Sequence, residues 1–182
     1  MSAGTIDDVR RARRILCFGV TGSGKSTMAV ALGERLGLPV TLVDDLCWSP
    51  GWVQRSRDEI DASVLPILAG DAFVLDTVYG FHNEHALTSV DVIVGLDYAR
   101  AVSLARLVRR TARRIRTREL VCNGNVETLR LALATDSVIV WHFRSWRSKR
   151  ERMRRWHADA SLPPVVLLSR PADADRLLAE LE

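Results

Sequence analysis

Short apolar runs alternate with longer stretches of helical spacing along most of this chain. The apolar runs are rich in branched residues and lack the polar alternation of a half-exposed strand, so they predict strands buried on both faces. The stretches between them have the spacing of amphipathic helices. We predict strands at about 14–18, 39–44, 71–76, 90–97 and 164–169, and helices at about 27–36, 57–69, 100–116, 126–134, 136–157 and 171–181.

This alternation of strands and helices predicts an α/β fold with three doubly wound layers, in which a mainly five-stranded parallel sheet has right-handed crossovers. Open sheets of this kind bind ligands beyond the carboxyl ends of their strands. Four aspartates fall at those ends: Asp44, Asp45, Asp76 and Asp97. We therefore expect the functional site at this edge of the sheet.

A glycine-rich segment carries the most specific chemical signal in the chain. Residues 19–26 read Gly-Val-Thr-Gly-Ser-Gly-Lys-Ser, a complete G-x-x-x-x-G-K-S pattern between a predicted strand and a predicted helix. In that context, backbone N–H groups surround the phosphates of a nucleoside triphosphate. Lys25 is expected to reach the β- and γ-phosphates, and Ser26 to hold Mg²⁺, so ATP and Mg²⁺ are the predicted cofactors. The predicted nucleotide-binding residues are Gly19, Thr21, Gly22, Ser23, Gly24, Lys25, Ser26 and Thr27.

Three aspartates are candidates for the chemistry beside this loop. Asp76 follows an apolar run, which is the context of an aspartate that orients Mg²⁺ or its water; the alternative is a turn or cap residue. Asp44 and Asp45 end a predicted strand. Either could bind an acceptor hydroxyl or receive its proton, with Asp45 as the catalytic candidate, or both could cap a following helix.

Aromatic residues accompany these aspartates in the predicted loops. Trp48, Trp52 and Tyr79 are expected at the same edge of the sheet. They could form a wall against which an acceptor ring stacks, or they could anchor the loops in the core.

The positive charge of the chain is almost wholly arginine. The sequence has 26 Lys and Arg residues and a net charge of +4, and its only lysines are Lys25 and Lys149. Arginines concentrate in the predicted helix 100–116, where Arg106 and Arg110 share one face. These two are candidates for neutralising a phosphoryl group during transfer. Because a charge run is usually a solvated helix face, we expect two or three arginines of this helix to contact phosphate and the rest to face water.

The length of 182 residues suits one compact domain, which we place at 13–182, with the arginine-rich helical region at about 100–157 as a short lid. Residues 1–12 are polar and of mixed charge, and we expect them to form a flexible arm. That arm lacks the apolar stretch of a signal peptide, and no apolar run is long enough to cross a membrane.

The three cysteines, Cys17, Cys47 and Cys122, have unrelated spacings. They indicate neither a disulfide framework nor a metal site, which fits the reducing cytoplasm.

Several segments together resemble the adenylate-kinase-like P-loop kinases, and most closely the bacterial topology-modulation (FlaR-type) proteins. The matching segments are 19–27, 45–48 with Pro50 and Trp52, 73–76, 94–97 and 123–128. The resemblance implies a three-layer core, a short lid and a region for a nucleotide acceptor. Adenylate kinases follow the aspartate of the third strand with Gly-Phe-Pro-Arg, whose arginine binds AMP, whereas this chain has Thr-Val-Tyr-Gly at 77–80.

These features favour a phosphotransferase that moves the γ-phosphoryl group of ATP to a small acceptor, which could be a nucleotide, a nucleoside or another hydroxyl compound. The alternative is a nucleotide-sensing regulatory NTPase that binds nucleic acid through its arginine-rich helices. A third possibility is an NTPase that hydrolyses ATP without an acceptor.

Overall fold

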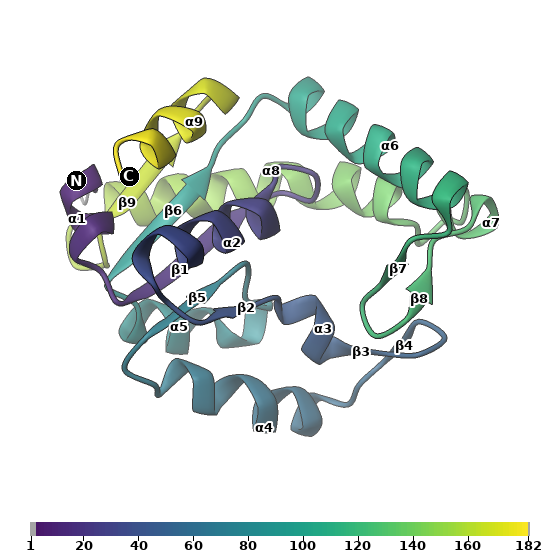
Figure 1. Ribbon diagram of the computed structural model, residues 1–182, viewed down its shortest axis with the longest axis horizontal. Helices are drawn as coiled ribbons and strands as arrows, with labels where there is room; N and C mark the ends of the chain where they lie inside the picture. Colours follow the sequence, from purple (N-terminus) through teal and green to yellow (C-terminus); the bar gives the residue numbers. More distant parts are fainter. Residues whose placement is uncertain (1–2, 182) are drawn as a thin grey trace.

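The computed structural model describes residues 3–181 and shows a parallel sheet between two layers of helices (Figure 1). The sheet has five strands in the order β2-β5-β1-β6-β9, and every neighbouring pair is parallel. This confirms the predicted fold class. The elements are α1 (Ile6–Arg11), β1 (Arg14–Gly19), α2 (Lys25–Leu36), β2 (Val40–Thr41), α3 (Val43–Cys47), β3 (Trp48–Ser49), β4 (Val53–Gln54), α4 (Arg57–Leu68), β5 (Phe73–Leu75), η1 (Gly80–His82), α5 (Asn83–Ser89), β6 (Val92–Leu96), α6 (Arg100–Thr117), β7 (Leu120–Val121), β8 (Asn125–Val126), α7 (Leu129–Ala132), α8 (Val138–Ala158), β9 (Val165–Leu168) and α9 (Pro171–Ala179).

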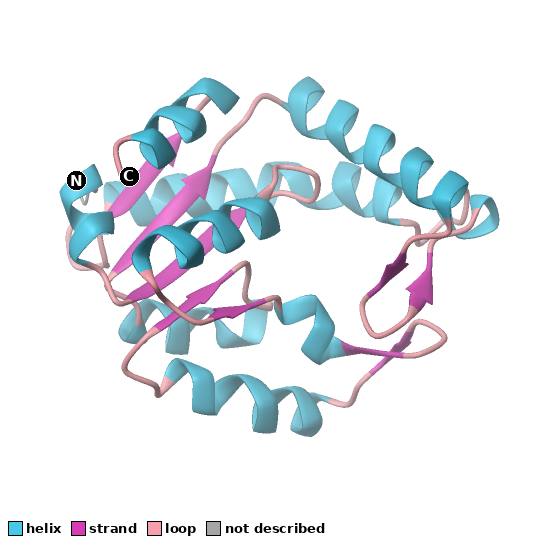
Figure 2. Cartoon of the chain, in the orientation of Figure 1, coloured by secondary structure: helices cyan, strands magenta, loops and turns pink. Residues whose placement is uncertain are grey.

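Strand β1 lies in the middle of the sheet, and its side chains enter two hydrophobic cores. Ile15 and Cys17 pack with α1, α2 and α9 on one face. Leu16 and Phe18 pack with α3, α4, α5 and α8 on the other. Figures 1 and 2 show α2 and α8 on opposite sides of the sheet. The absence of polar alternation in the predicted strand reflects this burial on both faces.

The segment 39–44 was expected to be one strand, but only two of its residues are strand β2. The chain then turns into the short helix α3, because the N–H of Val43 donates to the Asp76 carboxylate and the N–H of Asp45 donates to the carbonyl of Leu42. Asp44 and Asp45 therefore lie in the first turn of a helix rather than at the end of a strand.

The predicted helix 126–134 is also wrong over much of its length. Strands β7 and β8 form a hairpin that includes the start of this segment, and within it only α7 is helical. A second small hairpin, β3–β4, lies beside it (Figure 2). The side chain of Asn125 joins the two hairpins, because its Nδ2 donates to the carbonyl of Ser49 and its Oδ1 accepts from the N–H of Trp52.

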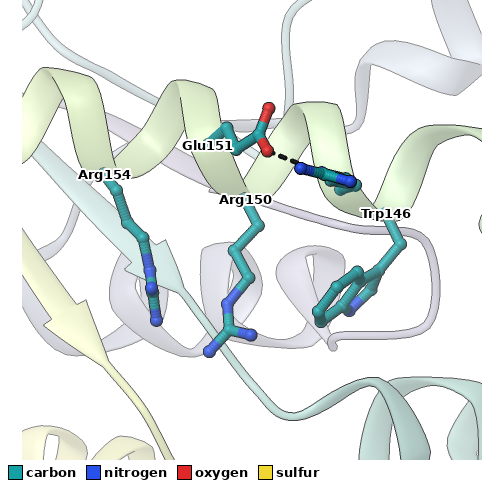
Figure 3. A pocket seen from close by; sticks show the side chains of 5 residues that line it. Trp146, Arg150, Glu151 and Arg154 are labelled. Carbon is teal, nitrogen blue, oxygen red and sulfur yellow. Dashed lines mark hydrogen bonds and ion pairs between the residues drawn. The ribbon is translucent and has the colours of Figure 1, made fainter.

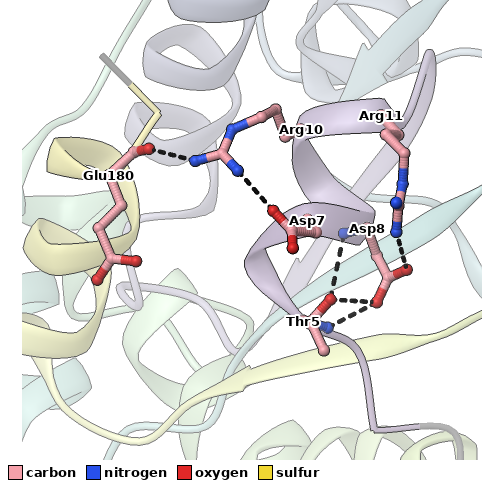
Figure 4. A network of polar contacts seen from close by, with 6 residues as sticks. All are labelled: Thr5, Asp7, Asp8, Arg10, Arg11 and Glu180. Carbon is pink, nitrogen blue, oxygen red and sulfur yellow. Dashed lines mark hydrogen bonds and ion pairs between the residues drawn. The ribbon is translucent and has the colours of Figure 1, made fainter.

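The N-terminal segment, expected to be a flexible arm, contains helix α1. Thr5 and Asp8 form a capping box at its start, and Val9 is fully buried (Figure 4). The N–H of Gly4 donates to Val165 in β9, and Arg10 donates to the carbonyl of Glu180. Ile6 and Val9 are the two apolar residues of this short helix, and two positions give too weak a periodic signal to be read from the sequence.

Helix α5 and the 3₁₀ turn η1 were not predicted either. None of the helices within residues 3–181 combines the length and the apolar character that crossing a membrane requires.

Helix α2 packs so closely on β2 at Gly33 that a side chain there would collide with its neighbours. A Cβ at this position would lie 2.1 Å from Cγ2 of Val40 and 3.0 Å from the carbonyl oxygen of Leu38. Gly33→Ala should lower the free energy of unfolding by about 1–3 kcal/mol through overpacking, although alanine favours a helix over glycine by about 1 kcal/mol. Urea unfolding measures the change. The exposed Glu34→Ala is the matched control, and it should stay within about 0.5 kcal/mol of the parent.

Candidate active site

The glycine-rich loop links the end of β1 to the first residue of α2, Lys25. Gly22 and Gly24 have φ angles of +82° and +98°, which turn the backbone in a way that side-chain-bearing residues rarely adopt. Gly22 also lies against α6, since a Cβ there would be 2.4 Å from the carbonyl oxygen of Ser103. The glycines thus permit both the loop conformation and its close contact with α6. Loops of this shape direct N–H groups at an anion.

Asp76 and Ser26 lie side by side at the start of α2. The Ser26 hydroxyl donates to Oδ2 of Asp76 at 2.6 Å, and the N–H of Val43 donates to Oδ1 at 2.9 Å. Asp76 is only 2% exposed. A hydroxyl and a carboxylate oxygen at this separation are the two protein ligands that Mg²⁺ takes beside triphosphate oxygens and water, so these residues fit that cation.

The environment of Asp76 acts on its carboxyl in two directions. Burial raises the pKa of this carboxyl above its usual value, while the Ser26 hydroxyl, the Lys25 ammonium and the Val43 N–H oppose that shift. A cation beside the carboxylate acts in the same direction as Lys25 and favours the charged form. The position therefore suits a carboxylate whose burial is offset by positive charge.

Two arginines of α6, Arg106 and Arg110, are candidates for contact with a phosphoryl group. Nη1 of Arg106 donates to the carbonyl of Ser23 in the loop at 3.2 Å, and its guanidinium lies 5.3 Å from the ring centroid of buried Tyr98. Arg110 is one turn further along, and its buried Nε has no hydrogen-bond partner among the described residues. Burial, with Arg114 nearby, lowers the pKa of Arg110. Arg110 thus carries a poorly hydrated positive charge facing the site.

Other arginines of the same region are paired with acidic residues. Arg114 bonds to Glu127 at 2.8 Å, and Arg113 bonds to Glu119 at 3.0 Å. Arg114 is partly buried in its ion pair, whereas Arg113 is largely exposed.

Asp97, at the carboxyl end of β6, also has a partner of its own. It is 5% exposed and binds Arg150 and Arg154 of α8. Figure 3 shows these arginines and Trp146 pointing to the same side of α8, while Glu151 points away and pairs with Arg147. Asp97 holds α8 against the sheet edge, although its position in the sequence resembles that of a ligand-binding aspartate.

Helix α3 presents two aspartates between the phosphate loop and the hairpins. The Tyr79 hydroxyl donates to Oδ1 of Asp44 at 3.3 Å. The carbonyl of Asp45 accepts from Nδ2 of Asn123 at 2.6 Å, which ties α3 to the β7–β8 turn. Asp44 is exposed and Asp45 partly so, which leaves both accessible to an acceptor.

Trp48 and Trp52 link the two hairpins. Their rings meet edge to face with centroids 5.9 Å apart. Nε1 of Trp52 donates to the carbonyl of Val126, and the carbonyl of Trp48 accepts from Asn123. These contacts make Trp48 and Trp52 anchors of the region next to α3. Tyr79 packs beside Phe81, and burial raises the pKa of its hydroxyl.

Helix α8 adds two residues that the sequence did not single out. His142 is fully buried, and its Nδ1 lies 2.9 Å from the carbonyl of Thr21 in the phosphate loop. Lys149 lies on the same face two turns later, in the electrostatic field of Lys25, Asp44 and Asp76. The sequence predicted a helix here, but it did not show which surface that helix meets.

Comparison with known families finds no matching family model and no matching curated protein. Solved structures do match, and several that carry the names of kinases share the fold of this chain.

Three of these structures illustrate the likeness. Shikimate kinase from Acinetobacter baumannii, in complex with shikimate, has a TM-score of 0.55 and 16% identity, over 97% of this chain and 94% of that chain. A gluconokinase from Sinorhizobium meliloti 1021 has a TM-score of 0.52 and 18% identity, over 92% of each chain. A sugar kinase from Janibacter sp. HTCC2649 has a TM-score of 0.52 and 15% identity, over 92% of this chain and 91% of that chain.

The pairing of Asp76 with Ser26 generates a prediction about cation dependence. Asp76→Asn should remove most of the gain in affinity that Mg²⁺ gives to binding of a nonhydrolysable ATP analogue, since an amide is a weaker, neutral ligand. Titration calorimetry with and without Mg²⁺ measures that gain. Asp71→Asn, at an exposed residue just before β5, is the control and should keep it. An unchanged gain in Asp76→Asn contradicts the assignment.

Proposed function

We propose that this protein is a Mg·ATP-dependent phosphotransferase that moves the γ-phosphoryl group to a small acceptor. One observation carries the proposal: the 2.6 Å contact between Ser26 and Asp76 at the end of a complete phosphate loop. A glycine-rich turn without nucleotide chemistry has no need of a buried aspartate on the serine that follows its lysine. The match to kinase folds over nearly the whole chain supports the same reading.

The residues divide the work of phosphoryl transfer by position. The loop amides and Lys25 bind the β- and γ-phosphates, and Ser26 and Asp76 hold the cation. Mg²⁺, when bound, neutralises charge on the phosphate oxygens. Arg106 and Arg110 reach the site from α6 and stabilise the charge on the phosphoryl group in transit. In this proposal a short lid is formed by α6 and the two hairpins.

The acceptor is expected to bind between α3 and the hairpins. Its hydroxyl oxygen forms a bond to the γ-phosphorus, the bond from that phosphorus to the bridging oxygen breaks, and ADP departs with the oxygen. The hydroxyl proton passes to a carboxylate, for which Asp45 is our candidate, while Asp44 orients the acceptor. Trp48, Trp52 and Tyr79 border this region and would contact the acceptor from the hairpin side.

The class of acceptor follows from the neighbours and from one missing residue. The similar structures include a shikimate kinase, a gluconokinase and a sugar kinase, whose substrates carry hydroxyl groups on a small carbon framework. The segment 77–80 lacks the arginine with which adenylate kinases bind AMP. We therefore favour a small hydroxyl compound over AMP, and we retain nucleotides and nucleosides, in line with the resemblance to the topology-modulation proteins, as alternatives. ATP as co-substrate and three free cysteines favour the cytoplasm as its location.

Lys25 tests the assignment directly. Lys25→Ala should lower acceptor-stimulated formation of ADP by at least about 100-fold, since it removes a charge that acts on the transferring group. The measurement is ADP release from Mg·ATP with a panel of sugar acids, cyclic hydroxy acids, nucleosides and nucleotides. Arg109→Ala, at an exposed residue of α6, is the control and should retain activity. Full activity in Lys25→Ala is incompatible with this site.

A second candidate function rests on a different surface. The guanidinium of Arg100 lies over Phe143, and that of Arg150 lies over Trp146, so α6 and α8 present arginines interleaved with aromatic rings. Such surfaces bind single-stranded nucleic acid by stacking and charge. The alternative is thus a nucleotide-sensing NTPase that binds nucleic acid.

Salt dependence distinguishes that alternative. A fluorescent single-stranded oligonucleotide should bind at low salt and lose affinity steeply as salt is raised, with a slope that falls when Phe143 and Arg100 are both changed to alanine. Absence of binding near physiological ionic strength rejects the nucleic-acid-binding alternative.

The ADP-release experiment also distinguishes plain hydrolysis of ATP. Turnover of ATP that no compound in the acceptor panel stimulates would indicate an NTPase without an acceptor.

A further inference from the structure

The chain has only two lysines, Lys25 and Lys149, and the fold brings both to one site. Every other basic residue apart from histidine is an arginine. Arginine suits flat, two-pronged contacts, whereas lysine is a compact point charge. The two positions that carry a point charge are separated by more than a hundred residues in the sequence. Their meeting at the phosphate loop needs an explanation.

The geometry of α8 places Lys149 beside the loop. The stripe of this helix that faces the sheet contains His142, Ser145, Met153 and Trp156, and all four are buried. Their spacing puts Lys149 in the middle of the same stripe.

Contacts on both sides of Lys149 fix where this stripe lies. Two turns before it, His142 contacts the carbonyl of Thr21 in the phosphate loop. One turn after it, Met153 packs on Gly95 of β6, opposite Phe18 at the end of β1. Lys149 therefore lies at the carboxyl ends of the central strands, next to the loop.

The charges around Lys149 are mixed. Burial, together with Lys25 and Arg152, lowers the pKa of its ammonium to about 8, although Asp44 and Asp76 act in the opposite direction. A buried ammonium facing another ammonium is unfavourable unless an anion lies between them. The acidic residues near Lys149 are Asp76, assigned above to the cation, and Asp44, assigned to the acceptor. Lys149 therefore lies between the proposed cation site and the proposed acceptor site.

We propose that Lys149 is a second phosphate-binding lysine, which contacts the terminal phosphoryl group of the bound triphosphate from the side of α8 while Lys25 contacts it from the loop. The proposal rests on the proposed binding of ATP in the loop and adds a residue that neither the motif nor α6 supplies. Lys149 keeps its proton throughout and takes part in no bond change. Its ammonium charge stabilises the group in transit and holds it in line with the acceptor.

Chemical labelling tests this directly, because each lysine yields its own peptide. The intact protein is treated with a limiting amount of an amine-acylating reagent, and the labelled fraction at Lys25 and at Lys149 is measured by mass spectrometry. The probes are Mg²⁺ with ADP and Mg²⁺ with the nonhydrolysable imido analogue of ATP, each at saturation. Both probes should protect Lys25 by at least about tenfold, and only the triphosphate analogue should protect Lys149 to a similar extent.

The outcomes separate the two proposals. If neither probe protects Lys25, the loop does not bind nucleotide and the proposed function fails. If Lys25 is protected but Lys149 is labelled equally with and without the triphosphate, only the role of Lys149 is overturned. Equal protection of Lys149 by ADP and by the analogue also overturns it, since contact with the third phosphate is then not what shields the amine.

Substitution gives an independent measurement. Lys149→Met should weaken binding of the triphosphate analogue by about tenfold or more while leaving ADP affinity within about twofold, as expected for loss of one charge-assisted contact. Once an acceptor is known, kcat should fall more than the KM for ATP rises, and Lys149→Arg should restore part of it. Arg147→Met, at an exposed residue of the same helix, is the control for folding and charge. Unchanged triphosphate affinity in Lys149→Met contradicts the proposal.

Discussion

The site depends on the buried carboxylate of Asp76, which joins three parts of the chain. One oxygen accepts from the Ser26 hydroxyl at the start of α2, the other accepts from the N–H of Val43 at the start of α3, and Asp76 itself directly follows β5. A buried carboxylate is costly unless donors and positive charge surround it. This requirement links the position of the phosphate loop to that of α3, and hence to Asp44 and Asp45. Asp76 thus joins the side assigned to the phosphates to the side assigned to the acceptor.

Positive charges around the loop are arranged in two ways. Arg114, Arg150 and Arg154 have acidic partners and hold the lid and α8 in place. Arg110 lies near Asp44 of α3, and its buried Nε has no hydrogen-bond partner among the described residues. Lys149 lies in the electrostatic field of Lys25, Asp44 and Asp76. A partly buried cation close to another cation favours an anion as ligand.

Sequence patterns predicted the central strands and the longer helices well, because these segments have a strong period and are buried on defined faces. They failed for α3, for the two hairpins and for α1, where tertiary contacts decide the backbone. Val43 begins a helix because Asp76 accepts its N–H, and Asn125 holds two hairpins together. Asp97 shows that the prediction of functional residues has the same limit. Its position in the sequence matched that of a ligand-binding aspartate, but its carboxylate is paired with Arg150 and Arg154.

By itself the sequence determined the class of fold, the phosphate loop and the identity of its lysine and serine, since these follow from local periodicity and from a contiguous motif. The sequence named Asp76 and Arg106 as candidates, and the tertiary structure decided their contacts: Asp76 with Ser26, and Arg106 with Ser23 of the loop. The position of Lys149 on α8, near Lys25, came from the tertiary structure alone. The physical reason is that periodicity shows which face of a helix is buried but not what that face meets. The meeting of α8 with the loop depends on contacts such as His142 with Thr21, which join residues far apart in the chain.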